Sequence, residues 1–571
     1  MPALEGAWQT LLVAVVLIAG CSRGKDARPP KADSLQGDAV QQAAAPTPAG
    51  ALELLFTYGS EKVKWIQETT AAFNAAGVKS SAGKPIFVRA VAMGSGECID
   101  GLLSGESKAH LTSPASVAFI ELGNSQSRAK TGQDLVGATQ NLVLSPVVIA
   151  MWKPMAEAIG WGKKPIGWSD IQRLATSSGG WADHGQGQWG KFKFGHTHPE
   201  YSNSGLIAVL AQVYAATDKQ AGLTLSDVEL PQTGKYLEEI QGSLVHYGSS
   251  TGFFGRKMFA GGPEYLSAAV LYENMVIEAN SAAERPVLPV VAIYPKEGSF
   301  WSDHPAGVVE RPWVTDVHRQ AAKSYIDYLL AKPQQQRALA FGFRPSDVEI
   351  PLDAPFDAAH GVNPKEPQTT LEVPKADVMN AVIQLWRQHK KKANIVLVFD
   401  TSSSMQQQNK IAAARDGAVE LVRLLGDEDL LSLLAFSEKL NWGQQAAPMK
   451  SARQSAAQSI QSLFPTSGTA LYDAVAAAHE YLAANPQADR ITAIVVLTDG
   501  ADTNSSLQLP DLLKKIQFDP EKHTTRIFTI GYGADAQLNV LKEIAEATQA
   551  KSFSGDKQNI REVFKEISTF F

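Results

Sequence analysis

Five oxygen-bearing side chains, supplied by three separate segments of the chain, form the set best suited to chemistry in this sequence. The segments are DTSSS, SGTALYDA and LTDG, and the side chains are those of Asp400, Ser402, Ser404, Thr469 and Asp499. None is histidine or cysteine, so every donor is a carboxylate or hydroxyl oxygen. Such donors suit a hard divalent cation, and Mg²⁺ fits best because it binds oxygen octahedrally and keeps positions open for water or another ligand. The set predicts a metal site, with Mn²⁺ or Ca²⁺ as alternative ions.

Two buried strands would have to position these side chains. The runs IVLVF and IVVL, which precede DTSSS and LTDG, are apolar and rich in β-branched residues, a pattern typical of central parallel strands covered on both faces. Their polar ends would meet at the carboxyl edge of the sheet, where open α/β sheets bind ligands. Alternate residues turn the same way, so Asp400, Ser402 and Ser404 can converge on one point. The competing interpretation is that DTSSS only caps a helix, with no metal bound.

Helices and strands alternate through the rest of this segment. Helical spacing of apolar residues predicts a helix over 405–425, strands follow at 430–436 and 526–533, and a last helix spans 559–570. This order predicts a doubly wound, Rossmann-like α/β fold with parallel strands. D-x-S-x-S, followed by Thr in SGTALYDA and Asp in LTDG, resembles the metal-ion-dependent adhesion site of von Willebrand factor A domains. The resemblance extends from about residue 394 to the C-terminus.

The resemblance implies a role for each of the five side chains. Ser402, Ser404 and Thr469 would ligate the metal directly, whereas Asp400 and Asp499 would act mostly through water. A carboxylate from a partner protein would complete the shell, because a metal held mostly by neutral hydroxyls stays electrophilic. Without the metal, the two aspartates are expected to be unpaired and to repel each other.

The opposite end of the chain predicts export and anchoring. Residues 11–19 are too short to span a bilayer but suit the apolar core of a signal peptide. They lead into Ile18–Cys21, which resembles the bacterial lipobox and makes Cys21 the expected acylated residue. The start of the chain has Glu5 and no Lys or Arg, which departs from usual leaders and leaves a plain secretory leader or an uncleaved anchor as alternatives. Ser22 resembles the outer-membrane sorting pattern of bacteria with two membranes.

The body of the chain contains repeated strand-to-helix turns rich in small hydroxyl residues. FTYGSEKV, AMGSGECI and LTSPAS place Ser or Gly at expected helix starts, where free amides can hold an anion or a polar ligand. With YSNSGL, YPKEG and a closing helix that leads into GFRP, they resemble type 2 periplasmic solute-binding proteins, which have two α/β lobes hinged by two crossovers. That resemblance implies a ligand cleft with candidate residues Ser60, Ser95, Ser113, Ser145, Ser202, Asn203, Ser204, Tyr272 and Glu273. The Ser and Asn residues among them could instead cap helices.

These features predict an α/β chain with five parts. They are a lipoprotein signal peptide at 1–20, a flexible tether at 21–50, a two-lobed periplasmic-binding-protein-like domain at 51–350, a proline-rich linker at 351–375, and a von Willebrand factor A domain at 376–571. The last part begins with an amphipathic helix, ADVMNAVIQLWRQHKKK, which we expect to pack onto that domain.

Composition agrees with a folded protein outside the cytoplasm. The chain has 571 residues, of which 44% are hydrophobic, enough for several cores. The net charge of −6, without a large basic block, argues against nucleic-acid binding. If Cys21 is acylated, Cys98 is the single cysteine left, so we expect it to be buried without a disulfide. No Walker loop and no CxxC occurs, and Asp303-His304 makes no recognisable catalytic set, so no enzyme is predicted.

The sequence therefore predicts a binding protein of the bacterial cell envelope, anchored to the membrane by lipid on the extracytoplasmic side. Its metal site would bind an acidic group of a partner protein, and its first module would take a small polar or anionic solute. The alternative is the solute-binding component of an ABC-type transporter, with the C-terminal domain as an accessory. Transport predicts tight binding of a small ligand, whereas adhesion predicts metal-dependent protein capture.

Cys21→Ser should abolish acylation and leave the protein either unprocessed or released from the membrane, because the acyl groups are added to that thiol. Metabolic labelling with a fatty acid checks this, with Cys98→Ala as the control that keeps the label. Wild-type protein that incorporates no fatty acid, or Cys21→Ser that still does, would contradict the lipoprotein assignment.

Overall fold

The computed structural model describes residues 47–282, 285–487, 489–519 and 525–571. The predicted signal peptide, the expected acylation site Cys21 and nearly all of the predicted tether lie outside these residues. The described residues belong to one compact unit, and no helix among them is long and apolar enough to cross a membrane. Cys98 is buried and forms no disulfide, in agreement with the expectation for that residue.

A five-stranded sheet forms the centre of the first lobe of the N-terminal module. It contains β1 (Leu52–Gly59), β2 (Ile86–Met93), β3 (Leu111–Ser113), β4 (Val136–Asn141) and β10 (Pro305–Val309), in the order β2-β1-β3-β10-β4. The first three strands are parallel, and β10 is antiparallel to β3 and β4. The helices are the short 3₁₀ helix η1 (Ser60–Lys62), α1 (Val63–Ala76), α2 (Ser95–Ser104), α3 (Val117–Thr131), α11 (Asp316–Leu330) and α12 (Lys332–Ala340). Phe56, Trp65 and Tyr325 lie in the core between sheet and helices.

The second lobe is built around one long strand. β5 (Val143–Trp152) pairs antiparallel with β7 (Ala268–Tyr272), β8 (Val290–Ile293), β9 (Trp301–Ser302) and β11 (Arg344–Pro345), and β6 (Phe194–Gly195) lies parallel to β7. The helices are α4 (Lys153–Ala158), α5 (Trp168–Thr176), α6 (Asn203–Thr217), α7 (Leu225–Val228), α8 (Pro231–Gln241), α9 (Thr251–Tyr265) and α10 (Glu273–Ser281), with 3₁₀ helices η2 (Gly180–His184) and η3 (Gly187–Trp189). Helix α6 is buried from Asn203 to Tyr214, and most of its residues are apolar.

Two crossovers between strands connect the lobes, as the resemblance to solute-binding proteins implies, and the chain passes once more from the first lobe to the second between α12 and β11. β4 of the first lobe is followed at once by β5 of the second, and β9 of the second lobe is followed at once by β10 of the first. Both crossovers carry residues of the candidate cleft or its surroundings, among them Ser145 on β5 and Ser302 on β9. The cleft therefore lies where the chain changes lobe.

The C-terminal module has a mainly parallel sheet in the order β14-β13-β12-β16-β17-β18. Its strands are β12 (Lys392–Asp400), β13 (Leu430–Phe436), β14 (Leu440–Trp442), β15 (Ala447–Pro448), β16 (Arg490–Thr498), β17 (Arg526–Tyr532) and β18 (Ser552–Gly555). β14 and β15 are antiparallel to β13, and all the other pairs are parallel. The two apolar runs predicted to be central strands are fully buried, and the predicted α/β class is confirmed.

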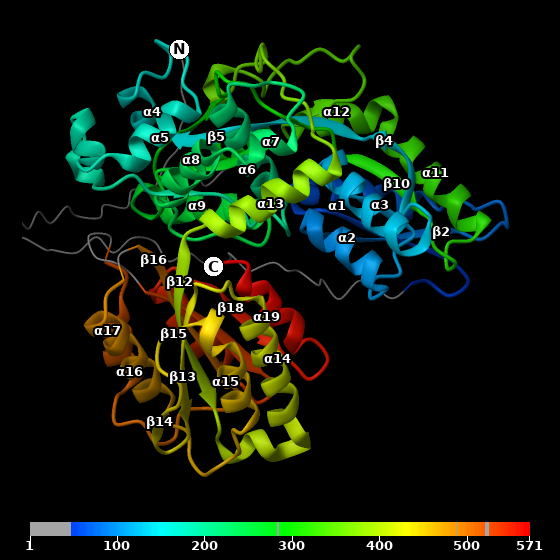
Figure 1. The fold of residues 1–571 in the computed structure, drawn as a ribbon. Coiled ribbons are helices and arrows are strands. Elements are labelled where there is room, and N and C mark those ends of the chain that lie inside the picture. Colours follow the sequence, from blue (N-terminus) through cyan, green and yellow to red (C-terminus); the bar gives the residue numbers. More distant parts are fainter. Residues whose placement is uncertain (1–46, 283–284, 488, 520–524) are drawn as a thin grey trace, which may run out of the picture. The chain divides into compact units, whose positions relative to one another are not determined.

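Helices cover both faces of this sheet (Figure 1). One face carries α14 (Lys410–Leu424), α15 (Met449–Gln461) and α19 (Ile560–Ser568), and the other carries α16 (Leu471–Ala484), α17 (Leu509–Ile516) and α18 (Leu538–Ala547). Successive residues of β12 alternate between the two cores, with Leu397 in the first and Val396 and Val398 in the second. A strand covered in this way needs apolar side chains at every position, which explains its unbroken pattern.

The helix predicted over 405–425 begins five residues later than expected. Residues Ser403–Asn409 form the kinked 3₁₀ segment η5, and α14 starts at Lys410. Gln408 and Asn409 have positive φ values of 51° and 59°, which a continuous α-helix does not allow. The apolar spacing was therefore correct for α14, but it did not reveal the turn that precedes it.

The proline-rich segment at 351–375 lies against the second lobe. It contains the 3₁₀ helix η4 (Ala358–His360), and its residues Phe356 and Leu371 are buried. The guanidinium of Arg344 donates to the backbone oxygens of Pro364 and Glu366. The segment is thus held in place by packing and by hydrogen bonds to its backbone.

Helix α13 (Ala376–His389) packs on α6, α7 and α8 of the second lobe, so the expectation that it packs onto the C-terminal module was wrong. Trp386 is fully buried there, with its ring 5.3 Å from that of Tyr247 and 4.7 Å from that of His198, and its Nε1 donates to Gln241 Oε1 at 3.3 Å. Amphipathicity predicts that a helix has one covered face, but it does not identify the covering element.

Candidate functional site

The predicted metal site lies where β12 and β16 end side by side. The register pairs Phe399 with Leu497, so Asp400 and Thr498 follow at the same edge of the sheet. Thr498 Oγ1 donates to Asp400 Oδ2 at 2.5 Å, and the Ser402 backbone N–H donates to Asp400 Oδ1 at 2.7 Å. Asp400 is completely buried and is held by these two bonds.

Two hydroxyls connect this carboxylate to the second one. Ser402 Oγ and Ser404 Oγ are 2.9 Å apart, and Ser404 Oγ donates to Asp499 Oδ1 at 2.6 Å. Asp499 is also completely buried. The alternation proposed for DTSSS is therefore found, and the structure brings these four side chains together.

Thr469 lies on a loop that is bonded to both strand ends. Its backbone N–H donates to Asn504 Oδ1 at 3.0 Å, and its carbonyl accepts from the backbone N–H of Thr503 at 2.8 Å. On the other side, the Thr466 N–H donates to the Thr401 oxygen at 2.6 Å. The three predicted segments thus form one connected set of loops, and Thr469 itself is nearly buried.

Asp499 is not unpaired, contrary to the expectation from sequence. Lys410 Nζ donates to Asp499 Oδ2 at 2.8 Å, and the side chain of Lys410 is only 9% exposed. The pair is not evident from the sequence, because Lys410 falls inside the helix predicted over 405–425 and lies 89 positions from Asp499. With α14 starting at Lys410, the ammonium reaches the edge of the sheet.

The donor set fits a hard divalent cation. Burial and, to a smaller extent, the charge of Asp499 raise the pKa of Asp400 to about 6, although Thr498 and Ser402 donate to it. A cation between the aspartates would offset that cost of burying negative charge. Among the described residues no group of three or more His, Cys, Asp and Glu could hold a metal, so such a cation depends on hydroxyls as well as the two carboxylates.

The candidate cleft residues of the N-terminal module are all buried. Asn203, the first residue of α6, donates through Nδ2 to Tyr272 OH at 3.1 Å and to Ser302 Oγ at 3.0 Å. The neighbouring N-cap, Ser202, makes no capping bond with its side chain, and its Oγ lies 3.1 Å from Thr251 Oγ1. The simple capping interpretation therefore fails for Ser202.

The remaining candidates have more varied surroundings. Ser95 Oγ accepts from the Ala115 N–H at 3.0 Å, and Ser145 Oγ accepts from the Asn274 N–H at 3.3 Å. Ser204 Oγ accepts from Thr251, Ser60 Oγ accepts from Gly252, and Ser113 Oγ is 3.5 Å from the His304 oxygen. The carboxylate of Glu273 is bound by Arg344 through two contacts of 2.7 Å, so its charge is already neutralised.

The two lobes touch across this cleft. The Gly252 N–H of the second lobe donates to Ser60 Oγ of the first at 3.3 Å, and the Gly96 N–H of the first donates to the Tyr201 oxygen of the second at 2.9 Å. A Cβ added to Gly96 would lie 2.2 Å from the backbone oxygen of Glu200, so only glycine permits this approach. The two lobes are therefore in direct contact beside the candidate cleft residues.

A buried cluster of charged groups beside the cleft was missed by the sequence analysis. Lys62 Nζ donates to Glu61 Oε1 at 2.7 Å and to His304 Nδ1 at 3.1 Å, and all three side chains are buried. Burial acts to raise the pKa of Glu61, but Lys62 and His304 outweigh it and lower that pKa to about 2. Burial and, to a smaller extent, the charge of Lys62 lower the pKa of His304 to about 4, so the ring is neutral at neutral pH. In the sequence, Glu61 and Lys62 directly follow the candidate residue Ser60, and this position is the feature that could have indicated the cluster.

Two polar atoms near this cluster have no partner among the described residues. They are His304 Nε2 and Asn203 Oδ1, and both side chains are fully or almost fully buried. His304 Nδ1 is 3.1 Å from Lys62 Nζ and 3.3 Å from Glu61 Oε1, so the tautomer of the ring sets whether Nε2 donates or accepts. The candidate cleft residues and this cluster therefore leave two polar atoms unpaired, and Tyr272 contacts both residues that carry them.

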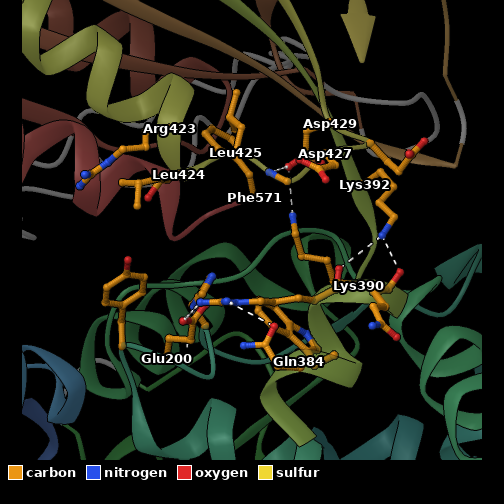
Figure 2. A pocket seen from close by; sticks show the side chains of 18 residues that line it. Glu200, Gln384, Lys390, Lys392, Arg423, Leu424, Leu425, Asp427, Asp429 and Phe571 are labelled. Carbon is orange, nitrogen blue, oxygen red and sulfur yellow. Dashed lines mark hydrogen bonds and ion pairs between the residues drawn. The ribbon is translucent and has the colours of Figure 1, made fainter. Parts of the chain in front are cut away.

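A pocket of about 620 Å³ is lined by none of the candidate residues of either set (Figure 2). Figure 2 shows Lys390 pointing toward Asp429, and the two groups are 3.4 Å apart. The other cations on its wall are also engaged: Arg387 with Glu200, Arg423 with Glu420, and Lys392 with the Gln388 oxygen. Because these charges are paired within the protein, we assign no ligand to this pocket.

Two family models match the chain. Residues 54–344, more than half of the sequence, match the model described as bacterial extracellular solute-binding protein. Residues 394–566 match the model of the von Willebrand factor type A domain. Both matches lie within the modules described above. Among curated proteins, none matches the chain.

Similar solved structures represent the same two folds. The von Willebrand factor type A protein from Catenulispora acidiphila is 23% identical with a TM-score of 0.29, over 32% of this chain and 42% of that chain. The sulfate-binding protein SubI from Mycobacterium tuberculosis H37Rv is 17% identical with a TM-score of 0.39, over 58% of this chain and 97% of that chain. The periplasmic binding protein AfuA from Actinobacillus pleuropneumoniae is 13% identical with a TM-score of 0.42, over 60% and 100%. At these identities the likeness concerns the fold alone.

Asp400→Asn should remove part of the pH dependence of stability of the metal-free protein. With a folded pKa of about 6 against an unfolded value near 4, Asp400 keeps its proton in the folded state over a range in which the unfolded chain has lost it. Its contribution to stability therefore falls as pH rises from about 4 to about 6, by about 3 kcal/mol.

Urea unfolding of the full chain in chelator, at about pH 4.5 and at neutral pH, measures this contribution. Asp400→Asn should lose less stability than wild type between the two conditions. Asp535→Asn, which changes a carboxylate that is 72% exposed, should behave like wild type. An identical pH response of all three proteins would show that burial does not perturb Asp400.

Proposed function

Because the chain belongs to the family of bacterial extracellular solute-binding proteins and also carries a von Willebrand factor type A domain, we propose that it is an extracytoplasmic binding protein that captures a partner protein through a divalent cation. The observation that carries this proposal is the contact between Ser402, Ser404 and Asp499 directly beside the buried Asp400. Anchoring through an acylated Cys21 belongs to the same proposal.

The side chains of the site would have different roles in binding the cation. The hydroxyls of Ser402, Ser404 and Thr469 would bind the cation, preferably Mg²⁺, and the two aspartates would hold water molecules around it. Thr498 and the Ser402 N–H orient the carboxylate of Asp400, and Ser404 orients one oxygen of Asp499. When bound, the cation supplies an electrophilic position for an acidic side chain of the partner.

Asp400→Ala and Thr469→Ala should each lower the affinity for Mg²⁺ or Mn²⁺ by about ten- to a hundredfold, because both remove groups that hold or orient the ion. Calorimetric titration of the full chain checks the affinity, and capture of envelope proteins with and without chelator checks its consequence. Both variants should stay folded, since the apolar strands of the sheet are unchanged.

Ser467→Ala is the matched control for Thr469→Ala. Ser467 lies on the same loop, but it is exposed and its hydroxyl bonds to Glu438. It should bind the cation as wild type does. Wild-type protein without any divalent-cation binding at millimolar concentration would refute the proposal.

Solute binding in the cleft is the second candidate function, favoured by the unpaired His304 Nε2 and Asn203 Oδ1. Lys62 and Glu61 neutralise each other, and Glu273 is neutralised by Arg344, so these groups leave no net charge for an ionic solute. Unpaired buried polar atoms are costly, and hydroxyl groups can donate to an amide oxygen and can pair with a ring nitrogen of either tautomer. We therefore infer that the solute is uncharged and polar. The protein would bind it as a component of a transport system, or the solute would serve only to hold the two lobes together.

A thermal-shift screen should find a stabilising ligand among uncharged polyols and sugars and none among sulfate, phosphate or charged amino acids. A ligand at a hundredfold excess over its dissociation constant adds about 2.7 kcal/mol of apparent stability. Asn203→Ala should lose the shift, whereas Asn441→Ala, an exposed residue of β14, should keep it. A screen without any hit would favour a module kept only as a scaffold, and an oxyanion hit would refute the inferred solute class.

A further inference from the structure

Lys410 is the one cation bonded to the predicted metal site in the described part of the C-terminal module. Its Nζ lies 2.8 Å from Asp499 Oδ2 and 3.4 Å from Asp535 Oδ2. Its backbone oxygen accepts from Tyr532 OH at 3.1 Å, which fixes the first turn of α14 beside β17. The ammonium is therefore held at the site by the fold itself.

Lys410 and Ser404 bind opposite oxygens of the same carboxylate. Ser404 Oγ donates to Oδ1 of Asp499, and Lys410 Nζ donates to Oδ2. Oδ1 thereby faces the two serine hydroxyls, which are the groups expected to bind a cation. Asp499 is therefore oriented even without a metal, and the ammonium of Lys410 already compensates part of its negative charge.

The charges of the site explain what this ammonium does. With the completely buried Asp400 and Asp499 as carboxylates and the nearly buried Lys410 as an ammonium, the net charge of these groups is −1. Asp535 is 72% exposed, so water screens its charge. A divalent cation alone would change the net charge to +1, and one added carboxylate would bring it to zero. Uncompensated charge in a buried site is costly, so the neutral state with both ligands is favoured.

We propose that Lys410 is an internal counter-cation that makes binding of the divalent cation and binding of a carboxylate mutually dependent. The cation binds weakly alone, and a carboxylate ligand binds weakly without the cation, but the two bind together. This inference rests on the proposed metal-dependent function, and it adds a reason why the site selects an acidic partner. Without Lys410 the two aspartates alone would balance a divalent cation, and a carboxylate would no longer be needed.

Calorimetric titration of the full-length protein with Mg²⁺ tests the inference, in sodium acetate and in sodium chloride of equal ionic strength. Acetate is the carboxylate probe. For wild type, acetate should tighten Mg²⁺ binding by about tenfold, within the usual range of coupling between sites. Lys410→Gln should bind Mg²⁺ about tenfold more tightly than wild type in chloride, and acetate should not change its affinity.

Two further variants separate charge from structure. Lys410→Arg keeps the positive charge and should retain the response to acetate. Lys450→Gln removes an exposed lysine of the same module and should match wild type. In chelator, Lys410→Gln should melt at a lower temperature than wild type and should regain stability with Mg²⁺, because its buried aspartates have lost their counter-charge.

The outcomes distinguish this inference from the function on which it rests. If wild type and Lys410→Gln bind Mg²⁺ with equal affinity and respond equally to acetate, the cation site stands and the role of Lys410 is refuted. If Lys410→Gln binds Mg²⁺ more weakly in both salts, Lys410 only orients Asp499, and the inference is overturned as well. If none of the four proteins binds Mg²⁺ in either salt, the proposed function fails and the inference fails with it.

Discussion

The burial of two carboxylates at the edge of a parallel sheet is the constraint on which the C-terminal module depends. Asp400 and Asp499 follow directly on strands that are covered on both faces, so neither side chain can turn into water. Each must therefore be compensated within the protein. Hydroxyls, one backbone amide and one ammonium provide this compensation, and the loops that carry them are bonded to one another around the strand ends.

The N-terminal module also compensates its buried charges, but it does so by pairing them with each other. Its buried charges occur as neighbouring pairs of opposite sign, Glu61 with Lys62 and Glu273 with Arg344. Such pairs give no excess charge to the cleft, and the uncompensated atoms there are dipolar: a ring nitrogen of His304 and an amide oxygen of Asn203. One module thus has a charge imbalance that a cation can correct, whereas the other has unpaired hydrogen-bonding atoms that a neutral molecule can satisfy.

The segment between the modules extends the second lobe. The proline-rich stretch buries Phe356 and Leu371, and α13 buries Trp386 among α6, α8 and the ring of Tyr247. Proline density indicates a lack of regular structure, but it does not exclude packing, because side chains and carbonyl groups still find partners. The lead-in helix of the C-terminal module is therefore structurally part of the N-terminal one.

The sequence by itself determined the parts that depend on neighbours along the chain. Unbroken β-branched runs determined β12 and β16, and alternation beyond β12 placed Asp400, Ser402 and Ser404 at one edge, since a strand reverses its side chains at every residue. Only the tertiary structure decided the pairings of distant residues. Lys410 meets Asp499 across 89 positions and Lys62 meets His304 across 242, through a turn with positive φ in the first case and a crossover between lobes in the second. Local periodicity determines which face of an element is covered, whereas the partner on that face is set by the topology of the whole chain.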